Sequence, residues 1–449
     1  MEFIPNSNVK KQMLEEIELK TINDLFSDIP KNIIINDFNL ADGLSQQETE
    51  KKLRKIASKN KSYNELLSFI GGGIKPHYVP SIVKSIVSRA EFFTSYTPYQ
   101  SEASQGFLQA MFEYQSLISE LTKLEIANCS LYDDVTALAE AALMCSRINR
   151  KKIFIVPENI SYDKKSVLKN YTKGADIKIK EIPFDIETGK IDINQLEKNI
   201  NNDIAGVYIE NPNFFGIFEN QINEINKLIK DANSLFVVGI DPLSLGIVKS
   251  PGEYGADIVI GEGRSLGNAI NFGGSSLGIF SCKKEFLRQM PGRIIGLTKD
   301  SSGKRAFCMT LQTREQHIRR GRATSNICTN EGLCALGAVT YLSWLGSKGL
   351  EKLSKINYEN GQNLAKKIET INGFKKMFIG THFNEFVIKC GKNPNEINKE
   401  LLKNNIQGGL LIDKWYPQLK NCMLFGITEI HSNDDIEKLI SNLKGDSNV

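Results

Sequence analysis

The chain is poor in the side chains that build metal and disulfide sites. Its 449 residues include only four histidines, and none of its eight cysteines belongs to a CxxC pair. Because a zinc site needs such ligands at close spacing, we predict no metal centre. Most cysteines lie in apolar surroundings, as Cys145 does after Met144, which favours buried, reduced thiols in a cytoplasmic protein.

Long apolar runs are also missing. The longest apolar stretch, residues 332–346, is shorter than the roughly 20 residues that a membrane-spanning helix needs. Met1–Asn6 lack the basic region, followed by an apolar one, that is typical of a signal peptide. The sequence therefore predicts a protein without a membrane partner.

Neither sign of charge is in large excess. The 56 basic and 52 acidic residues leave a net charge of +4, which argues against a dedicated nucleic-acid-binding protein and against a disordered chain. The arginines are nevertheless unevenly placed. None occurs in residues 151–263 or after Arg322, whereas residues 264–322 hold eight of the 12 and carry a net charge of +9. Such a density of arginine favours an anion site or an interface.

The middle of the chain alternates short apolar runs with amphipathic stretches. Helical periodicity over 104–124 and a helix cap at Asp133 come first. Strands are then predicted at 153–156, 177–182, 206–209, 236–240, 257–260 and 276–280, with helices at 162–171 and 219–231 between them. Apolar strands that alternate with helices are typical of a mostly parallel sheet covered on both faces. With right-handed crossovers, this pattern predicts a doubly wound α/β domain.

Two further regions flank this domain. Residues 1–75 are polar and helix-prone, and they predict an N-terminal helical arm whose last short helix ends at Gly71–Gly73. A long helix over 331–348 and strands over 385–389 and 423–427 indicate a smaller α+β C-terminal domain. We therefore predict an arm at 1–75, a large domain at 76–330 and a small domain at 331–449.

Acidic residues stand where two of the predicted strands end. Glu210 follows the strand at 206–209 and Asp241 follows the strand at 236–240. Ligands of doubly wound folds bind at this edge, where an aspartate can pair with the ring nitrogen of pyridoxal phosphate (PLP). A simple loop cap explains Asp241 equally well. A PLP enzyme also needs a lysine after the next strand, but Ser265 stands there, and serine cannot form the covalent link.

Residues 311–330 combine arginines with hydroxyl side chains. Such side chains, next to free backbone N–H groups, suit a phosphate or a carboxylate. The alternative is a solvated basic helix in which Glu315 and Arg319 form an i,i+4 pair. The concentration of arginine here favours the anion site or an interface.

Several segments together resemble one family, the alpha subunit of the two-chain glycine dehydrogenase (decarboxylating), which is the P-protein of the glycine cleavage system. The resemblance covers essentially the whole chain, and its most specific run is Leu311–Asn330. The other segments are Phe3–Asn6, Phe69–Gly73, Phe93–Glu102, Ser104–Gly106, Asn128–Asp133, Pro251–Glu253, Gly255–Val259, Pro291–Arg293 with Gly296, Gly408–Gly409 and Thr428–Glu429.

The resemblance implies a fold-type I PLP-dependent transferase architecture and an α2β2 heterotetramer. It also implies that the beta subunit carries the PLP lysine, so that this chain, with Ser265 at that position, is its degenerate sibling. Asp134 stands where the family usually has glycine. At ~6 Å and an effective dielectric constant of ~20, one carboxylate would repel a phosphate dianion by roughly 5 kcal/mol. We therefore expect no PLP in this chain's own site.

The activity that the resemblance implies is the decarboxylation of glycine with PLP on the beta subunit, followed by transfer of the aminomethyl group to the lipoyl group of the H-protein. The resemblance assigns this chain to the completion of that active site. On this basis, we expect three residues to reach the PLP phosphate of the partner, namely Thr324, Ser325 and Asn326.

Other assignments are less specific. Tyr96, Thr97 and Tyr99 are expected to line the entrance for glycine or the lipoyl group, although a packed turn around Pro98 is nearly as good an interpretation. His317 is assigned a structural role in preference to that of a general base. Two other functions are compatible with the sequence. One is a stand-alone PLP-dependent aminotransferase or desulfurase with its lysine elsewhere, and the other is a purely structural partner subunit.

Overall fold

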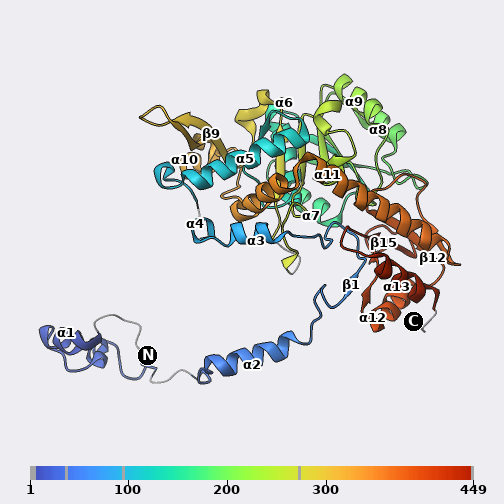
Figure 1. Cartoon of the computed structure of the whole chain (residues 1–449). Helices are drawn as coiled ribbons and strands as arrows, with labels where there is room; N and C mark the ends of the chain where they lie inside the picture. Colours follow the sequence, from blue (N-terminus) through green and yellow to red (C-terminus); the bar gives the residue numbers. More distant parts are fainter. Residues whose placement is uncertain (1–6, 36–38, 94–96, 272–274, 446–449) are drawn as a thin grey trace. The chain divides into compact units, whose positions relative to one another are not determined.

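The computed structural model describes residues 7–35, 39–93, 97–271 and 275–445 (Figure 1). The chain divides into two compact units, residues 1–61 and residues 62–449. Within the described ranges, no helix is long and apolar enough to cross a membrane.

The first unit contains short helices without a core. Its elements are η1 (Ser7–Val9), α1 (Lys10–Glu16), η2 (Ile22–Phe26) and α2 (Gln46–Ala57). The helix α2 begins with a capping box, in which the Ser45 hydroxyl accepts from the backbone N–H of Glu48 at 3.2 Å and the Glu48 carboxylate accepts from the N–H of Ser45 at 3.0 Å. Because α1, η2 and α2 bury no residue, local capping stabilises them more than packing does.

A sheet of seven strands forms the centre of the second unit. Strands β3, β4, β5, β6 and β7 pair in parallel, β8 runs antiparallel to β7, and β2 runs antiparallel to β8. The order is β2-β8-β7-β6-β5-β3-β4. The bounds are β2 (Ile126–Ala127), β3 (Ile153–Pro157), β4 (Lys178–Ile182), β5 (Ile204–Glu210), β6 (Leu235–Ile240), β7 (Ile258–Glu262) and β8 (Gly278–Cys282). The predicted doubly wound, mostly parallel sheet is confirmed.

Alternate side chains of the central strands enter two separate cores. In β6, Val237 packs in a core with α6 (Asp134–Asn149) and α7 (Tyr162–Lys173). Its neighbours Phe236 and Val238 pack on the other face, in a core with α8 (Ile193–Asn199) and α9 (Ile222–Asp231). Burial of both faces is the physical reason for the continuous apolar strands in the sequence.

A long helix leads from the large sheet to a second, smaller sheet. The helix α11 (Gly332–Glu369) packs against α3 (Ser81–Val87) and α5 (Gln105–Thr122). It consists of two helical segments joined by a kink at Gly346, with φ of 64°, and the second segment extends it past the predicted end. The second sheet has the order β11-β12-β15-β14 and is covered by helices α12 and α13. The bounds are β11 (Phe374–Lys376), β12 (Glu385–Cys390), α12 (Pro394–Lys403), β14 (Leu410–Leu411), β15 (Cys422–Gly426) and α13 (Asn433–Lys444).

The segment before Gly71 is not helical, so the predicted short helix is wrong. Residues Leu67–Ser68 form a strand, β1, that pairs in parallel with β13 (Ile406–Gln407), and Phe69 is buried in the core of the small sheet. The antiparallel hairpin of β9 and β10 was not predicted either. The remaining elements are β9 (Ile294–Lys299), β10 (Arg305–Thr310), α4 (Ala90–Phe93), α10 (Gln316–Arg319), η3 (Ser101–Ala103), η4 (Ser244–Gly246), η5 (Pro251–Tyr254), η7 (Lys284–Gln289), η8 (Gln312–Arg314) and η9 (Arg320–Arg322).

The cysteines are mostly buried. Cys129, Cys145, Cys282, Cys390 and Cys422 lie in the interior, and burial raises the pKa of the Cys129 thiol to about 12. Cys328 is exposed instead, because it belongs to the loop that precedes α11.

Candidate functional site

A cleft of about 340 Å³ opens at the carboxyl ends of the central strands. Glu210 is the last residue of β5, Asp241 follows β6 and Ser265 follows β7, and all three line the cleft. The small sheet contributes Glu385 and the loop after β14 contributes Trp415. The structure therefore brings Glu210, Asp241 and Ser265 to one cleft at the ends of their strands.

A buried lysine occupies one side of this cleft. The ammonium group of Lys164, on α7, lies 2.6 Å from the carboxylate of Asp134 and 2.6 Å from that of Glu210. The hydroxyl of Tyr208 donates to the same Glu210 carboxylate at 2.9 Å. Burial alone would lower the pKa of Lys164, but Asp134 and Glu210 outweigh it and hold that pKa well above its ordinary value. The cluster Lys164–Asp134–Glu210 thus carries a net charge of about −1 at neutral pH.

A further carboxylate of the cleft belongs to Glu262. Glu262, at the end of β7, accepts hydrogen bonds from the backbone N–H groups of Arg264 at 2.9 Å and Leu277 at 2.8 Å. Burial raises the pKa of Glu262 to about 7, and the nearby Asp134 adds to the rise. The Arg264 guanidinium donates to the hydroxyl of Ser276 at 2.7 Å, so part of its hydrogen-bonding capacity is used within the chain.

The cleft offers no free amine. The hydroxyl of Ser265 is buried and has no partner among the described residues. Lys164 is held by its two carboxylates, and the only other lysine among the described residues of the lining, Lys75, lies 2.8 Å from Glu385. A covalent cofactor link would need a lysine amine that neither position supplies.

The cleft also fits a phosphate poorly. Seven acidic and three basic residues are found among the described residues that line it. The N-terminus of α6 is already occupied, because the Asp133 carboxylate caps the helix by accepting from the N–H of Thr136 at 2.7 Å. The expected repulsion of a phosphate treated Asp134 as an isolated carboxylate, but Lys164 pairs with it. Because Lys164 is also paired with Glu210, one negative charge remains on the cluster. The residues present therefore do not fit PLP.

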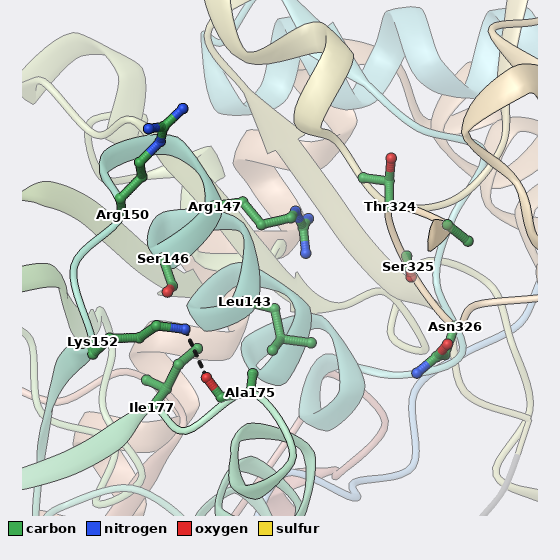
Figure 2. Close-up of a pocket in the computed structure, with 11 residues that line it drawn as sticks. Leu143, Ser146, Arg147, Arg150, Lys152, Ala175, Ile177, Thr324, Ser325 and Asn326 are labelled. Carbon is green, nitrogen blue, oxygen red and sulfur yellow. Dashed lines mark hydrogen bonds between the residues drawn. The ribbon is translucent and has the colours of Figure 1, made fainter. Parts of the chain in front are cut away.

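Thr324, Ser325 and Asn326 do not line this cleft. They border a second cavity, of about 440 Å³, together with residues of α6 and the first residues after it (Figure 2). The backbone N–H of Thr324 donates to the carbonyl of Arg314 at 3.0 Å, and the Ser325 hydroxyl accepts from the N–H of Ile327 at 3.0 Å. The structure thus fixes the backbone of this loop at one side of the cavity.

Two arginines of the basic region bind other parts of the chain, and one of them, Arg293, holds the residues just after this loop. Arg293 donates to the hydroxyl of Thr329 at 3.2 Å, the side chain of Asn330 at 3.1 Å and the carbonyl of Cys328 at 3.0 Å. Arg314 donates to the carbonyl of Gly292 at 3.0 Å. These two arginines bind neutral groups of the chain itself, so only part of the local positive charge faces outward.

Of the three residues expected at an entrance, the two that the structure describes do not line the cleft either. Tyr96 lies outside the described residues. Tyr99 is exposed and contacts the ring of His317, with a centroid distance of 6.0 Å, while the Arg293 guanidinium lies 5.8 Å from the centre of the Tyr99 ring. Thr97 has a buried hydroxyl without a partner in the described part of the chain. Neither Thr97 nor Tyr99 lines the cleft or the second cavity.

Sequence reasoning missed two cationic residues. Lys164 lies on a polar helix face, and nothing in the sequence shows that α7 packs beside the start of α6. Arg147 lies near the end of α6, where a cation is expected anyway for the helix dipole. The available signal for Arg147 was its position on a buried helix face, four residues after Leu143.

Comparison with known proteins agrees with this architecture. A family model described as glycine cleavage system P-protein matches residues 1–443. A protein of Thermococcus onnurineus named probable glycine dehydrogenase (decarboxylating) subunit 1 is 48% identical over 444 residues, covering 98% of each chain. One of the same name from Desulfitobacterium hafniense is 42% identical over 99% of each.

Solved structures give the same result. A crystal structure of a glycine decarboxylase (P-protein) of the glycine cleavage system, in inhibitor-bound form, has a TM-score of 0.89 and 36% identity, covering 99% of this chain and 100% of that one. A sphingosine-1-phosphate lyase of Burkholderia pseudomallei has a TM-score of 0.66 at 12% identity, over 94% of this chain and 93% of that one, and shows a shared fold alone. The predicted fold-type I PLP-dependent transferase architecture is confirmed, and the chain belongs to the glycine cleavage system P-protein family.

Proposed function

We propose that the chain is the alpha subunit of a glycine dehydrogenase (decarboxylating), the P-protein of the glycine cleavage system, and that it works with a beta subunit in an α2β2 heterotetramer. One observation supports the proposal most strongly. The cleft at the strand ends of this PLP-dependent transferase fold has no unpaired lysine among its described lining residues, and the chain is related over nearly its whole length to proteins named subunit 1. A subunit so named needs a second one. The proposed substrates are glycine and the lipoyl group of the H-protein, and the proposed compartment is the cytoplasm.

The beta subunit is proposed to hold PLP covalently. PLP supplies an electron sink when glycine loses its carboxylate as CO2. In this chain, Ser265 stands at the position of the lysine, and the Lys164–Asp134–Glu210 cluster lines the same cleft. The predicted organisation into an arm at 1–75 and domains at 76–330 and 331–449 is part of the same proposal.

This chain's part in catalysis is to position and to bind. The loop Thr324–Asn326 is proposed to donate hydrogen bonds from the Thr324 and Ser325 hydroxyls and the Asn326 amide to the phosphate of the partner's PLP. Two contacts fix the segment that follows the loop and so limit the loop's movement. Arg293 donates to the carbonyl of Cys328, and the Tyr132 hydroxyl accepts from the N–H of Cys328 at 2.9 Å. Tyr96, Thr97 and Tyr99 are proposed to border the entrance for glycine or the lipoyl group.

The loop assignment is tested with Thr324→Ala and Thr324→Ser in the reconstituted complex. We expect the alanine variant to release PLP faster during gel filtration, because one hydrogen bond to a charged phosphate contributes about 1.5 to 3 kcal/mol. The serine variant keeps the hydroxyl and should retain PLP as the wild type does. Equal retention in both variants would count against the assignment.

The two other functions make different predictions. A stand-alone aminotransferase or desulfurase would show bound PLP by absorbance when the chain is purified alone. A purely structural partner would tolerate Thr324→Ala and Tyr96→Ala without loss of activity in the reconstituted complex. Glycine-dependent exchange of CO2 by the co-expressed pair, and by neither chain alone, is the result expected from the proposed function.

A further inference from the structure

The cavity beside the Thr324–Asn326 loop has the composition of an anion site. Its wall on α6 carries Arg147, with Arg150 and Lys152 near its rim, and no acidic residue occurs among the described residues that line it. Figure 2 shows the Arg147 side chain pointing toward the loop that bears Thr324 and Ser325. The Thr324 hydroxyl has no hydrogen-bond partner in the described part of the chain, so it is free to donate to a ligand.

Arg147 is only partly satisfied where it lies. One of its Nη atoms donates to the carbonyl of Gln289 at 3.0 Å, whereas its Nε is buried without a partner in the described ranges. Burial lowers the pKa of Arg147, although the nearby Glu140 opposes the fall. Arg147 also lines the cavity, and no hydrogen bond of its other Nη is found within the described residues. A guanidinium in this condition binds a dianionic oxygen group well.

The nearest buried acid does not neutralise Arg147. Glu140 lies on the same helix, and both of its carboxylate oxygens are buried without a hydrogen-bond partner among the described residues. Burial raises the pKa of Glu140, although the charge of Arg147 and the nearby Ser325 hydroxyl oppose the rise. Burial thus disfavours the charged form of Glu140, and this carboxyl group forms no ion pair with Arg147 in the described structure.

Cations near the end of a helix are common, because they offset the helix dipole. This explanation accounts for Arg150, which is the exposed C-cap of α6. It does not account for a half-buried Arg147 with an unpartnered Nε, nor for the two hydroxyl residues that face it across the cavity. These features call for a ligand.

We propose that the cavity between α6 and the Thr324–Asn326 loop binds a phosphate group. Arg147 and the hydroxyls of Thr324 and Ser325 contact the phosphate oxygens, and Arg150 and Lys152 raise the positive potential at the rim. The phosphate has two possible sources, the PLP of the beta subunit or a free phosphorylated molecule. The first source rests on the proposed function, whereas the site itself does not.

The site is tested on the purified full-length chain by titration with inorganic phosphate at constant ionic strength, followed by calorimetry and 31P line broadening. We expect saturable binding that Arg147→Gln weakens about tenfold, as the loss of a charge-assisted hydrogen bond predicts, and that Arg150→Gln weakens by about threefold, as the loss of a surface charge predicts. Arg305→Gln, which removes an exposed arginine of β10 outside the cavity, is the matched control and should bind as the wild type does.

Two results would overturn the site. One is the absence of saturable phosphate binding to the wild-type chain. The other is equal affinity of the wild type, Arg147→Gln and Arg150→Gln. Because Arg150 is exposed, its variant will fold even if the change at Arg147 disturbs the Gln289 contact, and a thermal unfolding midpoint checks both.

The PLP-loaded complex with the beta subunit separates the two sources. If the partner's PLP supplies the phosphate, Arg147→Gln will speed the loss of PLP, and added phosphate will no longer bind to the wild-type complex. If a free phosphorylated molecule is the ligand, phosphate will bind to the complex and Arg147→Gln will leave PLP retention unchanged. Failure of the proposed function shows itself differently, as a pair of chains that forms no complex or holds no PLP while the chain alone still binds phosphate.

Discussion

A lysine at position 265 should not by itself give this chain a cofactor. In the variant Ser265→Lys, the new amine would stand after β7, where a PLP enzyme of this fold has its lysine. The phosphate would still meet the Lys164–Asp134–Glu210 cluster, in which one ammonium group lies 2.6 Å from each of two carboxylates. We therefore expect Ser265→Lys to bind PLP weakly.

The cost follows from the charges. A net charge of −1 at ~6 Å from a phosphate dianion, in an effective dielectric constant of ~20, opposes binding by roughly 5 kcal/mol. This corresponds to roughly three to four orders of magnitude in the dissociation constant. The further change Asp134→Asn leaves Lys164 paired with Glu210 alone, so the cluster becomes neutral and most of the cost disappears.

The assay is reduction with borohydride after incubation with PLP, followed by mass spectrometry of the chain. Ser265→Lys should show little adduct at a stoichiometric amount of PLP, whereas Ser265→Lys/Asp134→Asn should be labelled at position 265. Ser265→Lys/Asp203→Asn is the matched control, because Asp203 is exposed and precedes β5 at the opposite end of the strand from the cleft. Equal labelling of the single variant and the Asp134 double variant would refute the electrostatic reasoning.

Three further predictions concern stability and the loop. Although burial raises it, hydrogen bonds from His77 at 2.9 Å and from the N–H of Tyr78 at 2.7 Å lower the pKa of Glu429 to about 2. A carboxylate whose pKa is lower in the folded state stabilises the fold at pH values above its unfolded-state pKa, and this contribution is lost as the pH falls toward the folded-state pKa. Glu429→Gln should therefore lower the free energy of unfolding by roughly 3 kcal/mol at pH 7, and by less with each step from about pH 5 toward about pH 2. A difference between wild type and variant that stays constant in urea unfolding across this range would contradict this reasoning. Gly216→Ala should destabilise by more than about 2 kcal/mol, because φ is +80° and the new Cβ would lie 1.9 Å from the Glu385 carbonyl oxygen. Gly106→Ala on α5, where nothing lies within 4 Å, is the control and should be neutral or stabilising. Arg293→Gln should speed hydrogen exchange of residues 328–330 and lower activity of the complex, whereas Arg288→Gln should do neither; unchanged exchange in both would contradict the holding role of Arg293.

The central fold was predictable because its information is local. Continuous apolar strands such as that before Glu210 are several residues long and are separated by amphipathic helices, so the period of the pattern identifies them. The rule that ligands bind where parallel strands end then places Glu210 and Asp241 at one cleft without further data. The missing lysine at Ser265 follows from the same alignment of strands.

Other features depend on contacts that no local pattern encodes. The strand β1 has two residues, too few for any periodicity, and exists because β13 pairs with it. The ion pair between Asp134 and Lys164 joins two helices through their packing beside the sheet, so the sequence presents them as two unrelated surface charges. The positive charge of the basic region, by contrast, is visible in the sequence. The sequence does not show that Arg293 and Arg314 donate hydrogen bonds to carbonyl and side-chain oxygens of the chain itself.

We propose that this chain contributes to glycine decarboxylation without holding the cofactor. Co-expression with a beta subunit, followed by borohydride reduction of the purified complex and mass spectrometry of both chains, tests it most directly, with glycine-dependent CO2 exchange measured on the same sample. We expect exchange by the complex, none by this chain alone, and a PLP label on the beta subunit only. A PLP label on this chain, or full exchange by the beta subunit without it, would contradict the proposed division of roles between the two subunits.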